Sequence, residues 1–152
     1  MLHLITAVTM AVSSLTMPSS ARIVYLVNAE TQMCLAIGKG EARRGKNAIQ
    51  WPCIGTPAQR WLREGPLLVN EATGMCLAVG SGEVRKGKRL IQWPCNGYDD
   101  QKWDSEGQNP TRFKNYATGM CMAIGSGARV KGKAAIQWPC NNGKEQFWDQ
   151  QS

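Results

Sequence analysis

The sequence predicts an all-β domain made of three copies of one repeat that close on each other. The segment Cys34–Trp61 recurs as Cys76–Trp103 and as Cys121–Trp148, and these copies contain all six cysteines and all six tryptophans. Short runs of β-type residues, bounded by Gly, Pro and Asn, fill each copy, and no helical periodicity appears after residue 21. Three such units must close on themselves to avoid open sheet edges, because three are fewer than the blades of a usual propeller.

The first 21 residues differ in composition from the rest of the chain. The run from Leu4 to Leu15 is mostly apolar and uncharged, and Ser19 and Ala21 form a small-x-small cleavage pattern after it. The run is shorter than the roughly 20 residues that span a bilayer. We therefore expect residues 1–21 to be a secretory signal peptide, and residues 22–152 to be one extracellular domain without a membrane span. Because no Lys or Arg precedes the apolar run, the alternatives are a wrongly assigned start or a frayed N-terminal segment.

Each copy is expected to contain four short strands. The copies span residues 22–64, 65–107 and 108–152. In the first copy the expected strands cover residues 23–27, 33–37, 48–53 and 59–62. A turn follows the first strand, and there Gly74 and Gly119 supply the residue that best tolerates a positive φ, whereas the first copy has Gln32. We expect the turn at Gln32 to be different or strained.

The cysteines predict disulfides. Six cysteines in a small, exported domain are typical of a disulfide framework, and the chain lacks the CxxC and Cys/His spacings of zinc sites, since its one histidine is His3. In each copy the two cysteines lie 19 positions apart, so the repeat selects pairing within copies. The expected bonds are Cys34–Cys53, Cys76–Cys95 and Cys121–Cys140. We expect no metal and no cofactor.

The formal net charge is +7, and it divides between the three copies as +4, −1 and +4. A basic balance is typical of proteins with an acidic partner, although a soluble surface can also simply be basic. The loops Gly40–Lys46, Gly82–Lys88 and Gly127–Lys133 match GxxxxGK, but neither Ser/Thr nor a helix follows, so we expect no nucleotide site. We interpret the loops as solvated; three basic loops around the threefold axis that bind an anionic glycan are the alternative.

The repeat resembles that of the ricin B-type lectins. Each copy reads Cys-Leu-Ala-Ile/Val (Cys-Met-Ala-Ile in the third), then Gln-Trp-Pro-Cys, and then Gln-x-Trp beginning six residues after the second cysteine. The resemblance covers residues 23–150 and implies a β-trefoil with pseudo-threefold symmetry, the fold of many carbohydrate-binding modules of secreted bacterial glycosidases. It also implies that the Gln-x-Trp residues belong to the core. They are Gln59, Trp61, Gln101, Trp103, Gln146 and Trp148.

The second tryptophan of each copy matches the sugar-stacking position of the family, just before the second cysteine. An aromatic ring packs on the flat C–H face of a sugar, while nearby amides and carboxylates bind the hydroxyls. These tryptophans, Trp51, Trp93 and Trp138, each directly follow a Gln, so the two side chains point to opposite faces of a strand. Either the Gln or the Trp then lines a pocket. The sequence leaves open whether each Trp is an exposed platform or a second core layer.

An absence sets this chain apart from the best-known family pockets. Those pockets carry an Asp two residues after the first cysteine, where this chain has Ala36, Ala78 and Ala123. The loop after the second cysteine is polar in copies two and three, but in copy one it offers little to a hydroxyl. We therefore expect copies two and three to bind sugar and copy one to be structural. The candidate carbohydrate-binding residues are Gln92, Trp93, Asn96, Asp100, Gln137, Trp138, Asn141 and Trp51.

The residues for catalysis are scarce. The domain has no histidine, pairing would leave no free thiol, and no carboxylate recurs in all three copies, because Glu41 and Glu83 align with Ala128. A glycosidase needs two carboxylates at a set separation. We expect a secreted, monomeric, non-enzymatic lectin that binds oligo- or polysaccharide through weak sites that add by avidity. The alternatives are an interaction protein that binds an anionic polymer or a protein partner through its basic loops, its sugar pockets lost, and an enzyme inhibitor.

Overall fold

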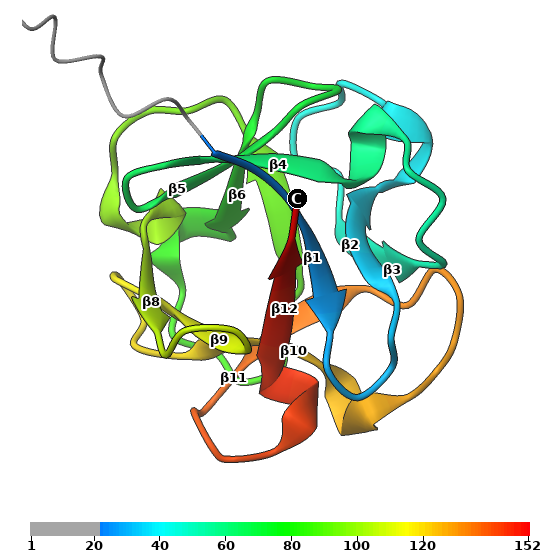
Figure 1. Cartoon of the computed structure of the whole chain (residues 1–152). Coiled ribbons are helices and arrows are strands. Elements are labelled where there is room, and N and C mark those ends of the chain that lie inside the picture. Colours follow the sequence, from blue (N-terminus) through cyan, green and yellow to red (C-terminus); the bar gives the residue numbers. More distant parts are fainter. Residues whose placement is uncertain (1–21) are drawn as a thin grey trace, which may run out of the picture.

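The computed structural model describes residues 22–152, and the predicted signal peptide lies outside the described residues. Within the described part the chain forms twelve strands and six 3₁₀ turns (Figure 1). The strands are β1 (Arg22–Asn28), β2 (Cys34–Ile37), β3 (Ala48–Trp51), β4 (Arg60–Glu64), β5 (Leu67–Asn70), β6 (Cys76–Val79), β7 (Leu90–Trp93), β8 (Trp103–Glu106), β9 (Thr111–Asn115), β10 (Cys121–Ile124), β11 (Ala135–Trp138) and β12 (Phe147–Gln151). The 3₁₀ turns are Gly38–Gly40, Pro57–Gln59, Gly80–Gly82, Asp99–Gln101, Gly125–Gly127 and Lys144–Gln146.

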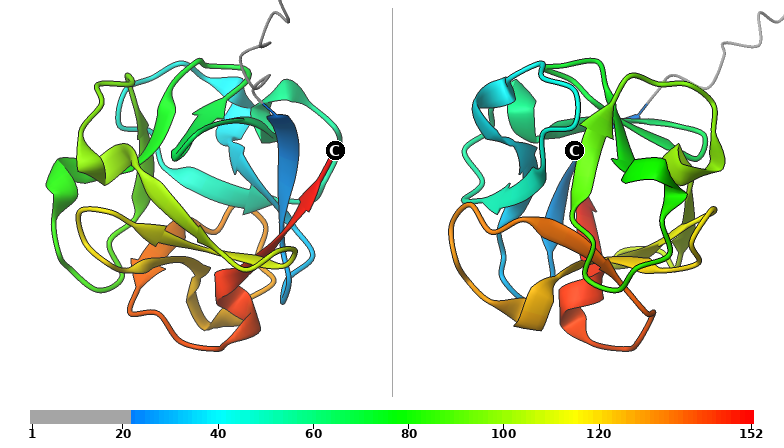
Figure 2. Two further views of the ribbon diagram at one scale, coloured as in Figure 1. Left: turned by 60° about the vertical axis from the view of Figure 1, so that its left-hand side comes forward. Right: turned by 180° about the vertical axis from the view of Figure 1, so that it is seen from behind.

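Six strands form a nearly closed antiparallel barrel and six form hairpins. In the barrel β1 pairs with β12 and β4, β4 with β5, β8 with β9, and β9 with β12. Between β5 and β8 the amide of Trp103 donates a 2.9 Å hydrogen bond to the carbonyl of Pro66. The hairpins are β2–β3, β6–β7 and β10–β11, one per copy. The copies lie around a common centre, in blue to cyan, green, and yellow to red (Figures 1 and 2), which confirms the predicted β-trefoil.

The tryptophans of the three Gln-x-Trp motifs lie in the core. Trp61, Trp103 and Trp148 are 0%, 2% and 0% exposed. Their indole Nε1 groups donate hydrogen bonds of 2.9, 3.0 and 3.1 Å to the carbonyls of Leu35, Leu77 and Met122. Each ring thus buries its apolar area and satisfies its one donor, as a buried Trp requires.

The glutamine of each Gln-x-Trp motif holds the loop that follows the second cysteine. Gln59 Nε2 donates to the Pro52 carbonyl at 2.7 Å, while its Oε1 accepts from the amides of Ile54 and Gly55 at 2.8 and 3.2 Å. Gln101 and Gln146 make matching bonds in copies two and three. These loops are therefore fixed from within the protein.

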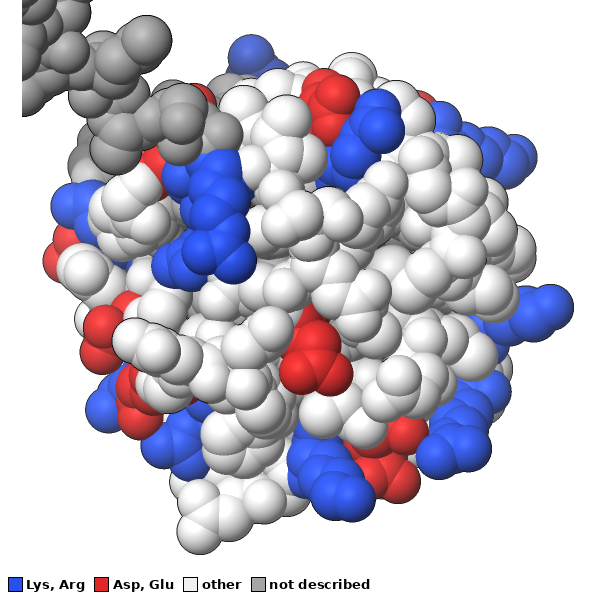
Figure 3. Space-filling view, in the orientation of Figure 1, with Lys and Arg blue, Asp and Glu red and all other residues white. Residues whose placement is uncertain are grey.

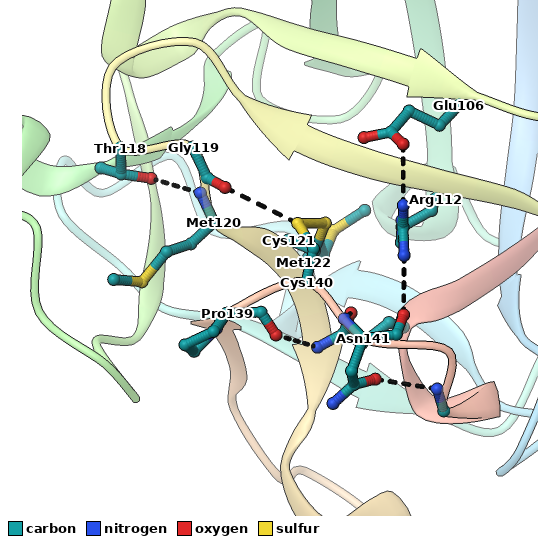
Figure 4. Close-up of a disulfide and its surroundings, with 12 residues drawn as sticks. Glu106, Arg112, Thr118, Gly119, Met120, Cys121, Met122, Pro139, Cys140 and Asn141 are labelled. Carbon is teal, nitrogen blue, oxygen red and sulfur yellow. Dashed lines mark hydrogen bonds and ion pairs between the residues drawn. A yellow bond between two sulfur atoms is a disulfide. The ribbon is translucent and has the colours of Figure 1, made fainter.

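Disulfides close the hairpin ends in all three copies. The bonds are Cys34–Cys53, Cys76–Cys95 and Cys121–Cys140, each with a Cα–Cα distance of 5.1 Å, within the range for disulfides. Each contributes on the order of 3 kcal/mol for a loop of this length. Figure 4 shows the third bond and its surroundings.

A buried asparagine at the end of the first strand fixes the loop of the preceding copy. Asn115 Oδ1 accepts hydrogen bonds from the amides of Ala117 and Thr118. Its Nδ2 donates a 2.9 Å hydrogen bond to the carbonyl of Asp100. Asn70 and Asn28 hold the carbonyls of Ala58 and Glu145 in the same way. The turn that follows has φ 60° at Gln32 and 69° at both Gly74 and Gly119. Copy one therefore keeps the shape of the turn and carries the predicted strain.

Candidate functional site

The pairing register of each hairpin sorts its side chains between the core and an outward face. In copy one Leu35 lies opposite Gln50, and both are buried. Ala36 lies opposite Ile49, and Cys34 lies opposite Trp51. Because side chains alternate along a strand, Ala36, Ile49 and Trp51 share the outward face. The same register holds in β6–β7 and β10–β11, so each copy presents an Ala, an Ile and a Trp together.

The second tryptophan of each copy is exposed. The exposed fractions of Trp51, Trp93 and Trp138 are 40%, 39% and 42%, in contrast with the buried Trp of each Gln-x-Trp motif. The structure thus favours the exposed platform over a second core layer. Each ring offers part of its surface to a ligand in an equivalent position of its copy.

The glutamine before each exposed tryptophan is buried. Gln92 and Gln137 are 0% exposed, and each Nε2 donates hydrogen bonds of 2.8 Å to two carbonyls in the loop of the preceding copy. For Gln92 these carbonyls are those of Glu41 and Arg43. Such side chains are not available to a ligand, which corrects the expectation that Gln92 and Gln137 contact sugar. Alternation along the strand aims the Trp outward and therefore the Gln inward.

Copy two contains a pocket of about 300 Å³ with both apolar and polar walls. Its residues are Ala78, Gly80, Ser81, Ile91, Trp93, Asn96, Tyr98 and Asp100. Asn96 Oδ1 accepts a 3.0 Å hydrogen bond from the amide of Tyr98, which fixes the loop that carries these side chains. Burial, with the neighbouring charge of Asp99, raises the pKa of the Asp100 carboxyl above its ordinary value. The pocket combines an aromatic ring with an amide, a phenol, a hydroxyl and a carboxylate.

Copy one contains a larger and more apolar pocket, of about 760 Å³. Ile54 and Ala58 occupy the places that Asn96 and Asp100 hold in copy two, beside the exposed Trp51. Of its three charged residues, Glu41 and Lys46 are paired with each other at 2.7 Å, and Lys39 is exposed. We had expected copy one to be structural, yet it has the larger concavity. Its low polar content agrees with the sequence, and its lining has the small Ala58 where copy two has Asp100.

In copy three the polar loop beside Trp138 is held by hydrogen bonds. Asn141 Oδ1 accepts from the amide of Gly143 at 2.8 Å, and its carbonyl accepts from Arg112 Nη1 at 2.7 Å. Arg112 also pairs with Glu106 at 2.8 Å, so a barrel strand supports the loop (Figure 4). Glu145 is the counterpart of Asp100 and is half-buried.

Sequence reasoning missed Tyr98, which lies with Asn96 and Asp100 in the copy-two pocket. These three residues alternate along the loop, which was a signal that the sequence contained. Ser81 and Ile91 were also missed. Ile91 could have been found from the hairpin register, because it lies opposite Ala78.

The Gly-rich loop of each copy lies against the exposed tryptophan of the next copy. The Gly45 amide donates a 2.9 Å hydrogen bond to the Gln92 carbonyl. A Cβ atom added at Gly45 would lie 3.8 Å from Cζ3 of Trp93. Gly87 meets Trp138 in the same way, and Gly132 meets Trp51. One side of each platform is therefore built by another copy.

Within residues 22–152, no group of three or more His, Cys, Asp and Glu residues is placed to hold a metal ion. No helix in this described part has the length and apolar character to cross a membrane.

Comparisons with known proteins agree with this geometry. The family model for the ricin-type beta-trefoil lectin domain matches residues 22–148. The designed threefold-symmetric protein ThreeFoil superposes with a TM-score of 0.80 at 22% identity, over 86% of this chain and 98% of its own. The Macrolepiota procera ricin B-like lectin, solved in complex with lactose, superposes with a TM-score of 0.74 at 18% identity. The match covers 88% of this chain and 96% of that lectin.

A third structure is an enzyme much longer than this chain. It is an exo-beta-1,3-galactanase from Clostridium thermocellum, with a TM-score of 0.77 at 23% identity, and the match covers 87% of this chain and 30% of the enzyme. Comparison with curated protein sequences found no match. The family match covers nearly all of the described residues, so the chain belongs to the ricin-type β-trefoil lectin family.

Proposed function

We propose that the protein is a secreted, monomeric, non-catalytic lectin that binds oligo- or polysaccharide through its exposed tryptophans. One observation carries the proposal: Trp51, Trp93 and Trp138 are 39–42% exposed at equivalent outward positions, while the other three tryptophans are buried. An exposed ring beside a few fixed polar groups is the usual composition of a shallow sugar site. The three disulfides agree with an oxidising, extracellular compartment.

Copy two is the site best suited to a sugar with free hydroxyls. Trp93 offers a surface for a C–H face, while Asp100 and Asn96 accept and donate hydrogen bonds. Copy three has the same types of residue in Trp138, Asn141 and Glu145. Copy one offers mainly apolar contact and contributes less to specificity. Because each site is shallow, a polysaccharide that reaches several of them gains affinity through avidity.

Two similar structures are named with their sugars: the Macrolepiota procera lectin with lactose and the earthworm R-type lectin C-half with GalNAc. Galactose-type sugars are therefore the first ligands to test. The alanines at positions 36, 78 and 123 lack the carboxylate of the best-known family pockets. In the copy-two pocket Asp100, from the loop after the second cysteine, is available to supply a carboxylate.

The test is a glycan array probed with wild type, Trp93→Ala and the conservative Trp93→Phe. Wild type is expected to bind neutral glycans, Trp93→Ala to lose roughly tenfold in affinity or more, and Trp93→Phe to retain most of it because an aromatic face remains. Because Trp93 is exposed, circular dichroism should show the same fold for all three proteins. If wild type binds no neutral glycan, or if Trp93→Ala binds as wild type does, the proposal is overturned.

A further inference from the structure

The basic residues of this protein are concentrated in its three Gly-rich loops. The loops are residues 38–47, 80–89 and 125–134, and together we name them the basic crown. They contain 11 of the 18 Lys and Arg residues but only 2 of the 11 Asp and Glu residues, a net charge of +9. The rest of the chain, with 7 basic and 9 acidic residues, is at −2. The excess positive charge of the protein therefore lies entirely in the crown.

The crown loops lie around the pseudo-threefold axis. Strands β3, β7 and β11 contact one another, and single bridges link Asn47 to Ile91, Arg89 to Ile136, and Ala134 to Ile49. Because this linkage is cyclic, the three loops meet at the same end of the barrel. By contrast, basic and acidic side chains are intermingled on the face drawn in Figure 3.

The two carboxylates of the crown are already paired. Glu41 lies 2.7 Å from Lys46 and 3.3 Å from Arg43, and the hydrogen bond from Lys46 lowers the pKa of Glu41. Glu83 has the same arrangement with Lys88 and Arg85. Even in its pair the side chain of Arg43 is 66% exposed. Six further basic residues of the crown are exposed and form no ion pair among the described residues: Lys39, Arg44, Lys86, Arg89, Arg129 and Lys131. In copy three Ala128 replaces the glutamate, so among the described residues Lys133 has no ion-pair partner.

The crown borders the candidate sugar sites. The Arg44 guanidinium lies 6.0 Å from the ring centre of Trp93, within the range of a cation–π contact. Lys86 and Lys131 hold the equivalent loop positions, next to the glycines that touch Trp138 and Trp51. Trp51 and Trp93 thus line a pocket each, and the Trp93 ring also has a basic side chain of another copy beside it. A polymer that stacks on one ring continues onto a positive surface.

We infer that the ligand of these sites is an acidic polysaccharide, whose sugar rings pack on the tryptophans while its carboxylate or sulfate groups rest on the basic crown. The inference rests on the proposed lectin function and adds the chemical class of the ligand. A polysaccharide fits better than a nucleic acid, because the Asp100 carboxylate in the copy-two pocket can accept hydrogen bonds from the free hydroxyls of sugar rings, which the deoxyribose units within duplex DNA lack. The three disulfides also indicate an extracellular setting.

The experiment compares polymers that differ only in charge. Polygalacturonate is paired with its methyl ester, dextran sulfate is paired with dextran, and duplex DNA is a separate polyanion. Binding of immobilised protein is measured by biolayer interferometry. At least one acidic polysaccharide is expected to bind about tenfold or more tightly than its neutral partner, and to weaken steeply between about 50 mM and about 200 mM salt.

Two double variants with equal charge change locate the binding surface. Lys86→Glu/Lys131→Glu lowers the crown from +9 to +5 and leaves the Arg44–Trp93 contact intact. The matched control is Arg22→Glu/Lys114→Glu, at two exposed positions outside the crown. The crown variant is expected to lose about tenfold in affinity for the acidic polymer and the control less than about threefold. The crown variant should lose less affinity for the neutral partner polymer than for the acidic one.

Each other result overturns the inference. Equal losses in the two double variants would mean that charge acts diffusely. Tighter binding of DNA than of either acidic polysaccharide would identify a different class of partner. If Trp93→Ala/Trp138→Ala leaves acidic-polymer binding unchanged, the crown acts without the sugar sites. Failure of the lectin function is a separate result, because it appears as no neutral glycan binding in wild type.

Discussion

Ala78 determines how the copy-two pocket must work. It is fully buried beneath the pocket and replaces the carboxylate that the best-known sites of the family use. The carboxylate of Asp100 reaches the same pocket from the loop after the second cysteine. In the site that we propose, hydroxyl recognition therefore depends on Asp100, a group whose pKa is raised by burial.

Acidification is expected to weaken sugar binding in copy two earlier than an ordinary Asp would allow. Burial raises the pKa of Asp100 above 3.8, so its carboxylate takes up a proton at a higher pH and then accepts fewer hydrogen bonds. Affinity measured by calorimetry should fall as the pH drops toward this raised pKa. Asp100→Asn should bind more weakly at neutral pH and lose this pH dependence; an unchanged profile would exclude Asp100 from the site.

Gln32 is the one residue in its turn position that has a side chain at positive φ. Since its φ of 60° lies in the left-handed region, Gln32→Gly is expected to raise the free energy of unfolding by up to about 1 kcal/mol. The reverse control is Gly74→Ala, where φ is 69° and no atom would contact the new Cβ, and it should cost about 1 kcal/mol. Urea denaturation measures both, and opposite signs from these would contradict the strain.

At the level of elements, the candidate site is assembled from different copies. The first strand of a copy fixes the pocket loop of the preceding copy through its buried Asn, and the Gly-rich loop touches the tryptophan of the next. The strands, turns and disulfides could be predicted because each follows from local residue types repeated three times. These cross-copy contacts could not, because a repeat does not reveal which copy its loops will meet.

Asn115→Ala is expected to weaken both the fold and the copy-two site. The substitution leaves the Asp100 carbonyl and the amides of Ala117 and Thr118 without their partners, at a cost of about 2 to 3 kcal/mol. It also releases the loop that carries Asp100. Thermal unfolding and glycan titration measure the two effects. The control, Asn142→Ala at an exposed position, should change stability by less than about 0.5 kcal/mol; an equal loss there would contradict the anchoring role.

Contacts between copies also decide which of Gln92 and Trp93 faces inward. Their adjacency predicted that one would face inward, but the sequence alone did not say which. The choice depends on the loop of copy one, whose carbonyls of Glu41 and Arg43 need a donor and receive it from Gln92. The copy-one pocket was likewise not visible in the sequence, because its lining includes Ala72, which belongs to copy two.

On the scale of the whole molecule, the pseudo-threefold repeat separates stability from binding. One tryptophan per copy is buried in the common core and one is exposed, while the positive charge lies in the crown at one end of the barrel. A substitution of an exposed tryptophan that lowers the affinity for a ligand should therefore leave the fold intact. The three sites can also differ in chemistry, since Ile54, Asn96 and Asn141 occupy equivalent positions.

The central claim is that the exposed tryptophans, and not the buried ones, bind sugar. The most direct measurement is the NMR titration of the six indole N–H signals with lactose and with oligogalacturonate. We expect shifts for Trp93 and Trp138, smaller shifts for Trp51, and none for the three indoles that donate to the carbonyls of Leu35, Leu77 and Met122. No shift with any glycan that the protein binds, or shifts confined to the buried set, would contradict it.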